Sequence, residues 1–540
     1  MDMPLPQLNV LDPTARQPEP LVDGADAKGL VTLIRPARVS SAGTWNIPLT
    51  PPLGLAYLAG MLAHHGVEVR AIDAMAEAVD QFIKEDGFLY QGLTIPQIVE
   101  RIDPASTVIA ISCMFTQDWP YTRRLVQAIR DRFPTALLVA GGEHMSALTD
   151  FSLRDCPQLD LCVVGEGEET ILELVRAAGD WQRLAQVPGV VFVDRSQPDA
   201  PLVRAPARAR IRAVDDIPWP AWDLFPVEVY LSTNNAFGVH RGRSMAILAT
   251  RGCPYKCTFC SNPQMYGKLW APREPKAVLA EMEHYIDRYG AENFDFYDLT
   301  MVLRKEWILE FCRLIEERGL QFTWQLPSGT RSEVIDDEVA AALYRTGCRN
   351  ITYAPESGSA ETLKRIKKQV HLDRLVASIR SALRQGIHVK CNILIGFPWE
   401  PRRSVLESAW LSWKLAVLGI DAVEVMLFTP YPGTELFDEL QADGTIPELG
   451  DDYFRSMAAF LDPFVPSRYC RTIGGRELIA WRSMIMLSFF ALSFALRPWR
   501  LVRLVKNVIV QKSETVVENR LAAILRRPKP QAAGVLRADA

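Results

Sequence analysis

The sequence lacks the features that mark nucleic-acid-binding, secreted or repeat proteins. Its net charge is −4 over 540 residues and its pI is near 6.1, so it has no excess of cations for a polyanion. No signal peptide with a basic and then an apolar region opens the chain, and no internal repeat is visible. We therefore expect a cytoplasmic protein whose ten cysteines stay reduced instead of forming disulfides.

The sequence also lacks an apolar run long enough to span a bilayer. Residues 483–496 carry no charge, but fourteen residues fall short of the roughly 20 that a membrane-spanning helix needs. Apolar residues interleaved with five cations follow this run: Arg497, Arg500, Arg503, Lys506 and Lys512. Two interpretations stay open, a buried core helix followed by an amphipathic one, or a helix on a membrane surface with its cations toward anionic lipid.

The composition is that of an ordinary globular protein, with 48% hydrophobic and 23% charged residues. The length suggests two to four domains. Residues 1–29 are rich in Pro and Asp, and we expect a flexible tail there.

Residues 30–205 alternate strand and helix patterns, which predicts a doubly wound α/β domain with a parallel sheet. The expected strands are 30–34, 67–72, 107–112, 136–140 and 161–164, and the clearest expected helices are 52–63 and 119–133. Ligands of such sheets bind at the carboxyl ends of the strands, here the loops after Ser112, Ala140 and Val164. The Pro- and Arg-rich residues 206–240 are interpreted as a linker.

Residues 241–440 resume the alternation and predict a partial (β/α)6 barrel, followed by a mainly helical region over 441–540. The expected strands are 246–250, 293–297, 321–325, 350–353, 389–395 and 422–428. Barrel active sites lie at the carboxyl ends of the strands.

Three cysteines follow the first expected barrel strand. Cys253, Cys257 and Cys260 have a C-x3-C-x2-C spacing that one loop can fold around an inorganic centre. A structural zinc needs a fourth ligand, and the flanking residues offer only His240. A cubane iron–sulfur cluster held by three cysteines instead leaves one iron open for chemistry. Except for Cys113, which stays undecided, the remaining cysteines are expected to be buried apolar residues: Cys156, Cys162, Cys312, Cys348, Cys391 and Cys470.

Together these patterns resemble the radical S-adenosylmethionine (SAM) enzymes that carry an N-terminal cobalamin-binding domain. The strongest match is Arg251-Gly-Cys-Pro-Tyr-Lys-Cys-Thr-Phe-Cys260. Weaker matches occur in the family's order: Pro51-Pro-Leu-Gly-Leu-Ala-Tyr-Leu-Ala59, Val163-Val-Gly-Glu-Gly-Glu168, Tyr353-Ala-Pro-Glu-Ser-Gly-Ser359, Ile395-Gly-Phe-Pro398 and Thr429-Pro-Tyr-Pro-Gly-Thr434.

The resemblance implies a [4Fe–4S] cluster on the three cysteines, with SAM chelating the fourth iron and cleaved there to a 5′-deoxyadenosyl radical. It also implies that Glu356 holds the ribose hydroxyls, since a carboxylate accepts two such hydrogen bonds, and that Phe259 stacks near the adenine. The backbone of 392–398 is expected to pair with the adenine edge, and Asp298 to support the site from behind. No residue is assigned as a catalytic acid or base.

The resemblance implies cobalamin as well, although the D-x-H-x-x-G pattern that supplies a cobalt-binding histidine in many cobalamin proteins is missing. We therefore do not expect His144 to bind cobalt. The loop that begins Ser112, Cys113 and Met114 is expected under the corrin ring. Glycines are expected to let the backbone approach the cofactor: Gly141, Gly142, Gly165 and Gly167.

The favoured function is methylation of an unactivated carbon of a small or hydrophobic substrate through methylcobalamin. Oxidative ring closure, as in the anaerobic cyclase of bacteriochlorophyll synthesis, is the second possibility, and a cobalamin or redox sensor the third. The expected partners are a small or lipid-like substrate and a one-electron donor such as flavodoxin or ferredoxin, with no nucleic acid. Peripheral attachment to the inner face of the membrane is left open by the apolar and basic C-terminal region.

Overall fold

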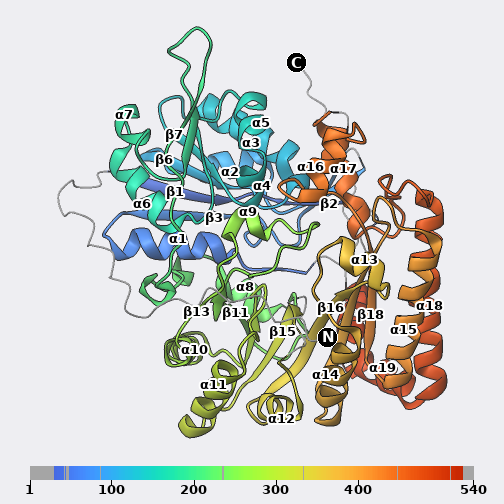
Figure 1. Ribbon diagram of the computed structural model, residues 1–540. Helices are drawn as coiled ribbons and strands as arrows, with labels where there is room; N and C mark the ends of the chain where they lie inside the picture. Colours follow the sequence, from blue (N-terminus) through green and yellow to red (C-terminus); the bar gives the residue numbers. More distant parts are fainter. Residues whose placement is uncertain are drawn as a thin grey trace.

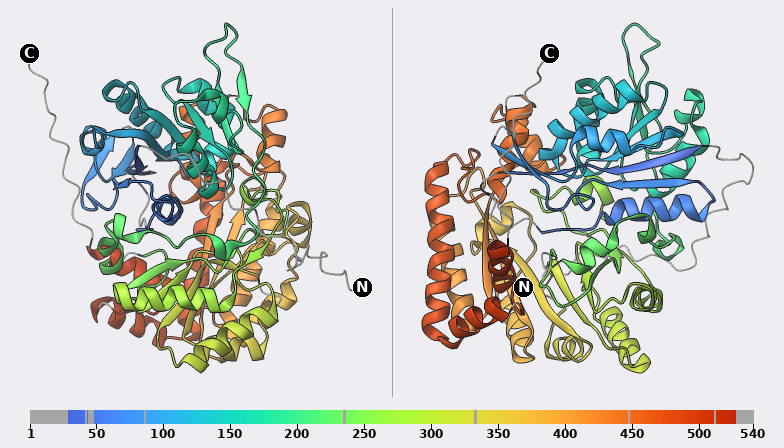
Figure 2. Two further views of the ribbon diagram at one scale, coloured as in Figure 1. Left: turned by 90° about the vertical axis from the view of Figure 1, so that its left-hand side faces the viewer. Right: turned by 180° about the vertical axis from the view of Figure 1, so that it is seen from behind.

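The computed structural model describes residues 29–526 except 42, 44–47, 86, 234–235, 332–333, 447 and 511. It contains two α/β units stacked on each other, with a layer of C-terminal helices along one side (Figures 1 and 2). The predicted tail over 1–29 lies outside the described residues apart from Gly29.

The first unit is built on a seven-stranded sheet with the order β10-β9-β8-β7-β6-β1-β3. Strands β1, β3, β6, β7 and β8 are parallel, and β9 and β10 add an antiparallel edge. Their bounds are β1 (Leu30–Arg35), β3 (Val69–Asp73), β6 (Ser106–Ser112), β7 (Leu137–Gly141), β8 (Leu161–Val163), β9 (Val190–Val193) and β10 (Leu202–Arg204). The chain reverses its direction of winding between β1 and β6, where doubly wound sheets open a ligand crevice.

Helices cover both faces of this sheet because successive β6 residues point to opposite sides. Val108 and Ala110 pack with α1 (Leu53–His64) and α6 (Glu168–Ala177), whereas Ile109 and Ile111 belong to the core of the other face. The helices of that other face are α2 (Ile95–Arg101), α3 (Trp119–Arg132), α4 (Glu143–Ala147) and α5 (Thr149–Asp155). Residues that the sequence left unassigned form α7 (Trp181–Leu184), η1 (Thr116–Asp118) and a small antiparallel sheet of β2 (Arg38–Ser41), β5 (Phe88–Gln91) and β4 (Phe82–Glu85).

The second unit is the expected partial barrel of six parallel strands in sequential order. They are β11 (Ser244–Ile247), β14 (Asn293–Phe296), β15 (Thr323–Thr330), β16 (Cys348–Glu356), β17 (His388–Ile395) and β18 (Ala422–Leu427). The outer layer contains α10 (Pro275–Tyr289), α11 (Lys305–Arg318), α12 (Asp337–Arg345), α14 (Leu372–Arg384) and α15 (Arg402–Leu418), and the short α13 (Ala360–Arg365) follows β16. The predicted fold class is confirmed.

The segment expected as a linker is folded against both units. It contains η2 (Val214–Asp216), η3 (Trp222–Leu224) and α8 (Val227–Ser232), and the Trp222 side chain is buried in the main core. Arg208, Arg210 and the backbone of Ile211 bind carboxylates in or just before α6. The arginines of this segment therefore attach the connection between the two units to the first unit.

The C-terminal region is helical, as expected. Its elements are α16 (Glu435–Ala442), α17 (Asp451–Ser456), η4 (Met457–Phe460), α18 (Gly475–Leu496), α19 (Trp499–Val510) and α20 (Val516–Arg526). Helix α18 has 22 residues and is long and apolar enough, by length and composition, to cross a membrane. The uncharged run of fourteen residues is shorter than this helix, because α18 begins before the run and includes Arg476, Glu477 and Arg482. One face of α18 packs on α15 and β18.

Candidate active site

The three cysteines lie on the loop that leaves β11, at the carboxyl end of the barrel. The loop begins with β12 (Thr250–Arg251), which pairs antiparallel with β13 (Ala271–Pro272). This pairing holds together the two ends of the segment that contains the cysteines. The Thr258 N–H donates to the Ile366 carbonyl, and the Leu436 N–H donates to the Thr258 carbonyl. These backbone hydrogen bonds attach the cysteine loop to the segments after β16 and β18.

Asp298 supports the start of this loop. Its carboxylate accepts from the Ala249 N–H at 3.2 Å and from the Thr250 hydroxyl at 2.6 Å. Burial raises the pKa of Asp298 to about 6. Asp298 therefore fixes the turn that leads to Cys253.

The three thiols are half-buried and lie close enough to influence one another. Burial raises the pKa of each, to about 12 for Cys260, while Lys368 and Arg331 oppose the rise at Cys253 and Cys257. Within the described residues, no three His, Cys, Asp or Glu side chains are arranged to hold a single metal ion. Three thiols beside two cations fit an anionic iron–sulfur cluster, which needs thiolate ligands.

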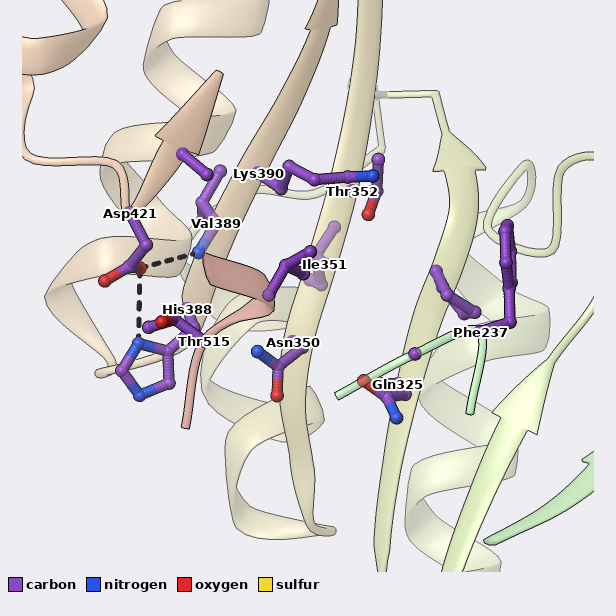
Figure 3. Close-up of a pocket in the computed structure, with 14 residues that line it drawn as sticks. Phe237, Gln325, Asn350, Ile351, Thr352, His388, Val389, Lys390, Asp421 and Thr515 are labelled. Carbon is purple, nitrogen blue, oxygen red and sulfur yellow. Dashed lines mark hydrogen bonds and ion pairs between the residues drawn. The ribbon is translucent and has the colours of Figure 1, made fainter. Parts of the chain in front are cut away.

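His240 does not approach this loop. It lies at the opposite end of the barrel, where its N–H donates to Asn519 in α20. The same end holds a cavity of about 20 Å³ lined by the starts of β15 to β18, too small for a nucleoside (Figure 3). There Asp421 accepts from His388 and from the Val389 N–H.

Glu356 ends β16 next to the cysteines with an unusual backbone. Its φ is +67°, a left-handed conformation that non-glycine residues rarely adopt, and its carboxylate is buried. Lys368 donates to this carboxylate at 2.9 Å, and its ammonium lies 5.9 Å from the Phe259 ring centre. Sequence reasoning missed Lys368, which stands alone in a loop with no pattern around it.

The loop after β17 differs from expectation in one respect. The N–H groups of Gly396 and Phe397, within the segment expected to pair with an adenine edge, both donate to Glu400. Those two donors are therefore already satisfied. Phe397 also makes an edge-to-face contact with Phe259, at 5.9 Å between ring centres. The Phe259 ring therefore lies beside the loop after β17.

Buried polar atoms without a hydrogen-bond partner collect at this same end of the barrel. Among the described residues they include Oγ1 of Thr258 and Thr330, Oδ1 of Asn392, Nε1 of Trp399 and Oε1 of Glu400. Such atoms are costly in a protein interior unless a ligand or water satisfies them. Their grouping fits a polar ligand bound at this end of the barrel.

The loop after β6 in the first unit carries exposed apolar side chains. Ser112 ends β6, Cys113 is buried, and Met114 and Phe115 are 56% and 47% exposed. Burial raises the pKa of the Cys113 thiol well above its ordinary value. An apolar loop tip at the carboxyl end of the sheet fits the flat face of a macrocycle.

Two of the four expected glycines are required by geometry. Gly142 has a φ of +117°, and a Cβ there would lie 2.5 Å from the Cys113 carbonyl oxygen. Gly165 has a φ of +82° and faces α9 (Asn262–Tyr266), the helix after the cysteine loop. Gly167 packs against Leu58, and a Cβ on Gly141 would meet nothing closer than 3.9 Å.

His144 is a buried residue whose hydrogen bonds are made within the first unit. Its ring nitrogens contact the hydroxyls of Thr116 and Ser152, and the ring stacks on Trp119. Burial lowers its pKa to about 3, so the imidazole is neutral.

A buried ion-pair cluster joins the two units at the cysteine loop. The Arg251 guanidinium contacts Glu168 at 2.6 Å and Glu166 at 3.3 Å, and lies 5.0 Å over the Tyr57 ring. Arg210 contacts the second oxygen of Glu166 at 2.8 Å. The motifs 51–59, 163–168 and 251–260, which are distant in sequence, therefore meet at Arg251, two positions before Cys253.

A second charged group lies where the first unit meets the barrel. Asp118 in η1 is near Arg35 and Arg38, and burial raises its pKa to about 7. Arg35 also donates to Tyr230 of α8 at 2.6 Å. No sequence pattern had indicated this group.

Comparisons with known proteins agree with the two units. The B12 binding domain model matches residues 48–175, and the radical SAM superfamily model matches residues 247–409. An uncharacterised methyltransferase of Pyrococcus horikoshii is 30% identical over 388 residues, covering 72% of this chain and 78% of the relative. The anaerobic magnesium-protoporphyrin IX monomethyl ester cyclase of Cereibacter sphaeroides is 26% identical, over 74% of this chain and 61% of the cyclase.

The fold has a solved counterpart in the radical SAM methyltransferase TsrM of Kitasatospora setae. The TM-score is 0.58 at 18% identity, covering 77% of this chain and 76% of that one. This likeness confirms the predicted fold class, an α/β domain followed by a partial barrel. Taken with the domain matches and the 30% identical relative, it shows that the chain belongs to the cobalamin-dependent radical SAM enzymes, whose cofactors are a [4Fe–4S] cluster, SAM and cobalamin.

Proposed function

We propose that this protein is a C-methyltransferase that modifies an unactivated carbon of a small or hydrophobic substrate. The observation that carries the proposal is the contact between the cysteine loop and the first unit, which Arg251 makes with Glu166 and Glu168. When bound, the cluster and SAM supply a carbon-centred radical, and cobalamin carries the methyl group. The protein itself binds, orients and shields these groups.

We assign the cluster to Cys253, Cys257 and Cys260. Lys368 and Arg331 neutralise part of the negative charge that three thiolates bring, as their opposition to the raised pKa values of Cys253 and Cys257 indicates. Residues 241–440 form the part of the chain that binds SAM. Glu356 is assigned to the ribose hydroxyls, Phe259 to the adenine, and the unsatisfied Asn392 and Trp399 atoms to polar groups of the same ligand.

Residues 30–205 are assigned to cobalamin, with residues 206–240 connecting the two parts. We place the lower corrin face against Ser112, Cys113 and Met114, and the neighbouring backbone of four glycines against the cofactor's edge: Gly141, Gly142, Gly165 and Gly167. The neutral, fully bonded His144 supports a cobalt without a histidine ligand from this chain.

The reaction needs one electron from outside the protein, and a reduced flavodoxin or ferredoxin is the proposed donor. We place the enzyme in the cytoplasm, with peripheral contact at the inner face of the membrane. Residues 441–540 supply this contact and help to enclose the substrate.

Oxidative cyclisation is the second candidate because the cyclase relative shares both domains at 26% identity. Product mass separates the two reactions. Anaerobically reconstituted protein, an electron donor, SAM labelled in its methyl group and a cell extract should give a labelled product together with 5′-deoxyadenosine and S-adenosylhomocysteine. Gain of oxygen or loss of hydrogen without label would establish the cyclase class and overturn the proposal.

Cys257→Ala is the matched control for this experiment. It should abolish 5′-deoxyadenosine formation and lower the iron content, while cobalamin binding by the first unit is retained. Cys312→Ala, a buried cysteine in α11 far from the loop, should keep its iron. A cobalamin or redox sensor would show no SAM cleavage in the unmodified protein.

A further inference from the structure

Helix α19 presents its apolar side to solvent. Five of its residues are 49–73% exposed: Leu501, Val502, Val505, Ile509 and Val510. They follow helical spacing and line a shallow depression with a wholly apolar surface, to which Lys506 contributes its stem. A soluble helix normally turns such a stripe toward the core, so this face, which we call the α19 face, is unpartnered in the described structure.

The orientation of α19 is fixed by its cations. Arg500 donates to the carbonyls of Gly419 and Ile420, which follow the end of α15, at 2.6 and 2.7 Å. Arg503 contacts Asp421 at 3.2 Å and Glu518 at 3.1 Å. Because these two side chains point inward, the apolar residues between them must point outward.

This arrangement corrects one sequence interpretation. The surface-helix hypothesis placed the cations of this region toward lipid, but Arg497, Arg500 and Arg503 bind the carbonyls and carboxylates of the barrel. Lys506 remains on the exposed side. The apolar residues therefore form the outward surface, and the exposed Lys506 borders it.

The neighbouring helices extend the apolar character of this side of the molecule. Trp410 and Val417 of α15 are 68% and 57% exposed, and Leu487 of α18 is 70% exposed. Figures 1 and 2 show α15 and α18 running side by side on the outside of the barrel, with α19 continuing from the end of α18. Trp499, at the start of α19, is 62% exposed.

Charge identifies the occupant of this surface. After the inward-pointing Arg503, residues 504–540 contain seven Arg and Lys against three Asp and Glu, a net charge of +4 in a chain whose total is −4. The segment 527–540 has little apolar surface with which to bind the α19 face, because Val535 and Leu536 are its only large apolar residues. An apolar face in a cationic segment matches the surface of a bilayer that contains anionic lipid.

We propose that the α19 face is a lipid-binding surface that inserts its apolar side chains into the headgroup region of an anionic membrane. Helix α18 lies beside the membrane and does not cross it, because its Leu478, Ile485 and Phe489 are buried against the barrel. Arg482, in the first half of α18, also donates to the Asp462 carbonyl at 2.7 Å. The inference deepens the proposed peripheral contact and gives a lipid-like substrate a short path to the enzyme.

Vesicle flotation of the full-length protein tests the inference. The probes are vesicles of phosphatidylcholine alone and of equal parts phosphatidylcholine and phosphatidylglycerol. The unmodified protein should float with the anionic vesicles, and Val505→Asp/Ile509→Asp should lower its partition coefficient at least about tenfold, because two inserted side chains are lost. Lys506→Glu should weaken binding to anionic vesicles alone, and added salt should have the same effect.

Trp181→Asp is the matched control, since it replaces a 46% exposed apolar side chain by a charge on α7 of the other unit. It should float like the unmodified protein. Equal flotation of the double variant, or no flotation of the unmodified protein, would overturn the inference. Light scattering tests a different occupant, a second copy of the chain. If the unmodified protein is a dimer, the double variant is a monomer and neither floats, the α19 face is a contact between copies.

Folding and chemistry are checked separately from docking. The double variant should keep the iron content, the thermal midpoint and the SAM cleavage of the unmodified protein in solution, because its substitutions are solvent-exposed. Failure of the methyltransferase proposal would appear as loss of label transfer in solution. Failure of the docking inference would appear only in flotation.

Discussion

Replacing Arg251 by methionine should loosen the cysteine loop without altering a cysteine. The guanidinium lies 2.6 Å from Glu168 and 3.3 Å from Glu166, and all three side chains are less than 10% exposed, at 5%, 8% and 3%. The pKa of Arg251 is raised and that of Glu168 is lowered, chiefly by their mutual attraction against the cost of burial. Both groups are therefore charged in the native protein.

The expected loss follows from the charges left behind. Without Arg251, two buried carboxylates remain, and only Arg210, at 2.8 Å from Glu166, neutralises one of them. Removing one partner of a buried ion pair costs about 3–5 kcal/mol. A domain has a net stability of about 5–15 kcal/mol, so the loss is a large part of what holds the loop against the first unit.

The assay is urea unfolding combined with iron and cobalamin content after anaerobic reconstitution. Arg251→Met should unfold at a lower urea concentration and retain less iron, and adding Glu168→Gln should restore part of the loss through a coupling of about 0.5–3 kcal/mol. Arg313→Met is the control, because its partners Glu310 and Glu317 form solvent-exposed pairs, which contribute little to stability. If Arg251→Met unfolds like this control with full iron, the Arg251 cluster does not hold the loop.

Three further outcomes follow from individual residues. Gly142→Ala should destabilise the first unit by about 1–3 kcal/mol and weaken cobalamin retention, since its Cβ would meet the Cys113 carbonyl at 2.5 Å, whereas Gly141→Ala should bind cobalamin normally. Burial raises the pKa of Glu400 from 4.5 to about 7, so the native state holds a proton that the unfolded chain releases and stability should fall as pH rises between these values. Glu400→Gln should remove that slope in pH-dependent thermal unfolding; an unchanged slope would contradict the assignment. Glu356→Gln should raise the KM for SAM about tenfold through loss of a charge-assisted hydrogen bond, while the exposed Glu361→Gln should leave it unchanged.

The charge cluster at Arg251 changes the meaning of one sequence motif. Val163-Val-Gly-Glu-Gly-Glu168 suggested glycines that let the backbone approach a cofactor, and Gly165 keeps the required positive φ. Its two carboxylates, however, are occupied by Arg251 and Arg210. The motif therefore also joins the two units. The sequence of this loop alone could not indicate this role, because its partners lie far away in the chain.

Sequence periodicity located the strands that matter because a strand buried on both faces must be apolar along its length. All five strands expected in 30–205 and all six in 241–440 are present, with ends displaced by a few residues. Five strands of the first unit escaped detection, since each has only three or four residues and so shows too short a pattern: β2, β4, β5, β9 and β10. The cysteine loop was equally visible, because three thiols at fixed spacing are a local property of the chain.

What the sequence by itself determined is the fold class, the cysteine loop and the family to which they belong. Only the tertiary structure decided which side chains meet: Lys368 with Glu356, Arg251 with Glu166 and Glu168, and Glu400 with the loop after β17. It also decided the orientation of α19, whose cations turn inward to the end of α15 and Asp421. Periodicity gives the two faces of a helix, but the partners available on each side determine which face is buried.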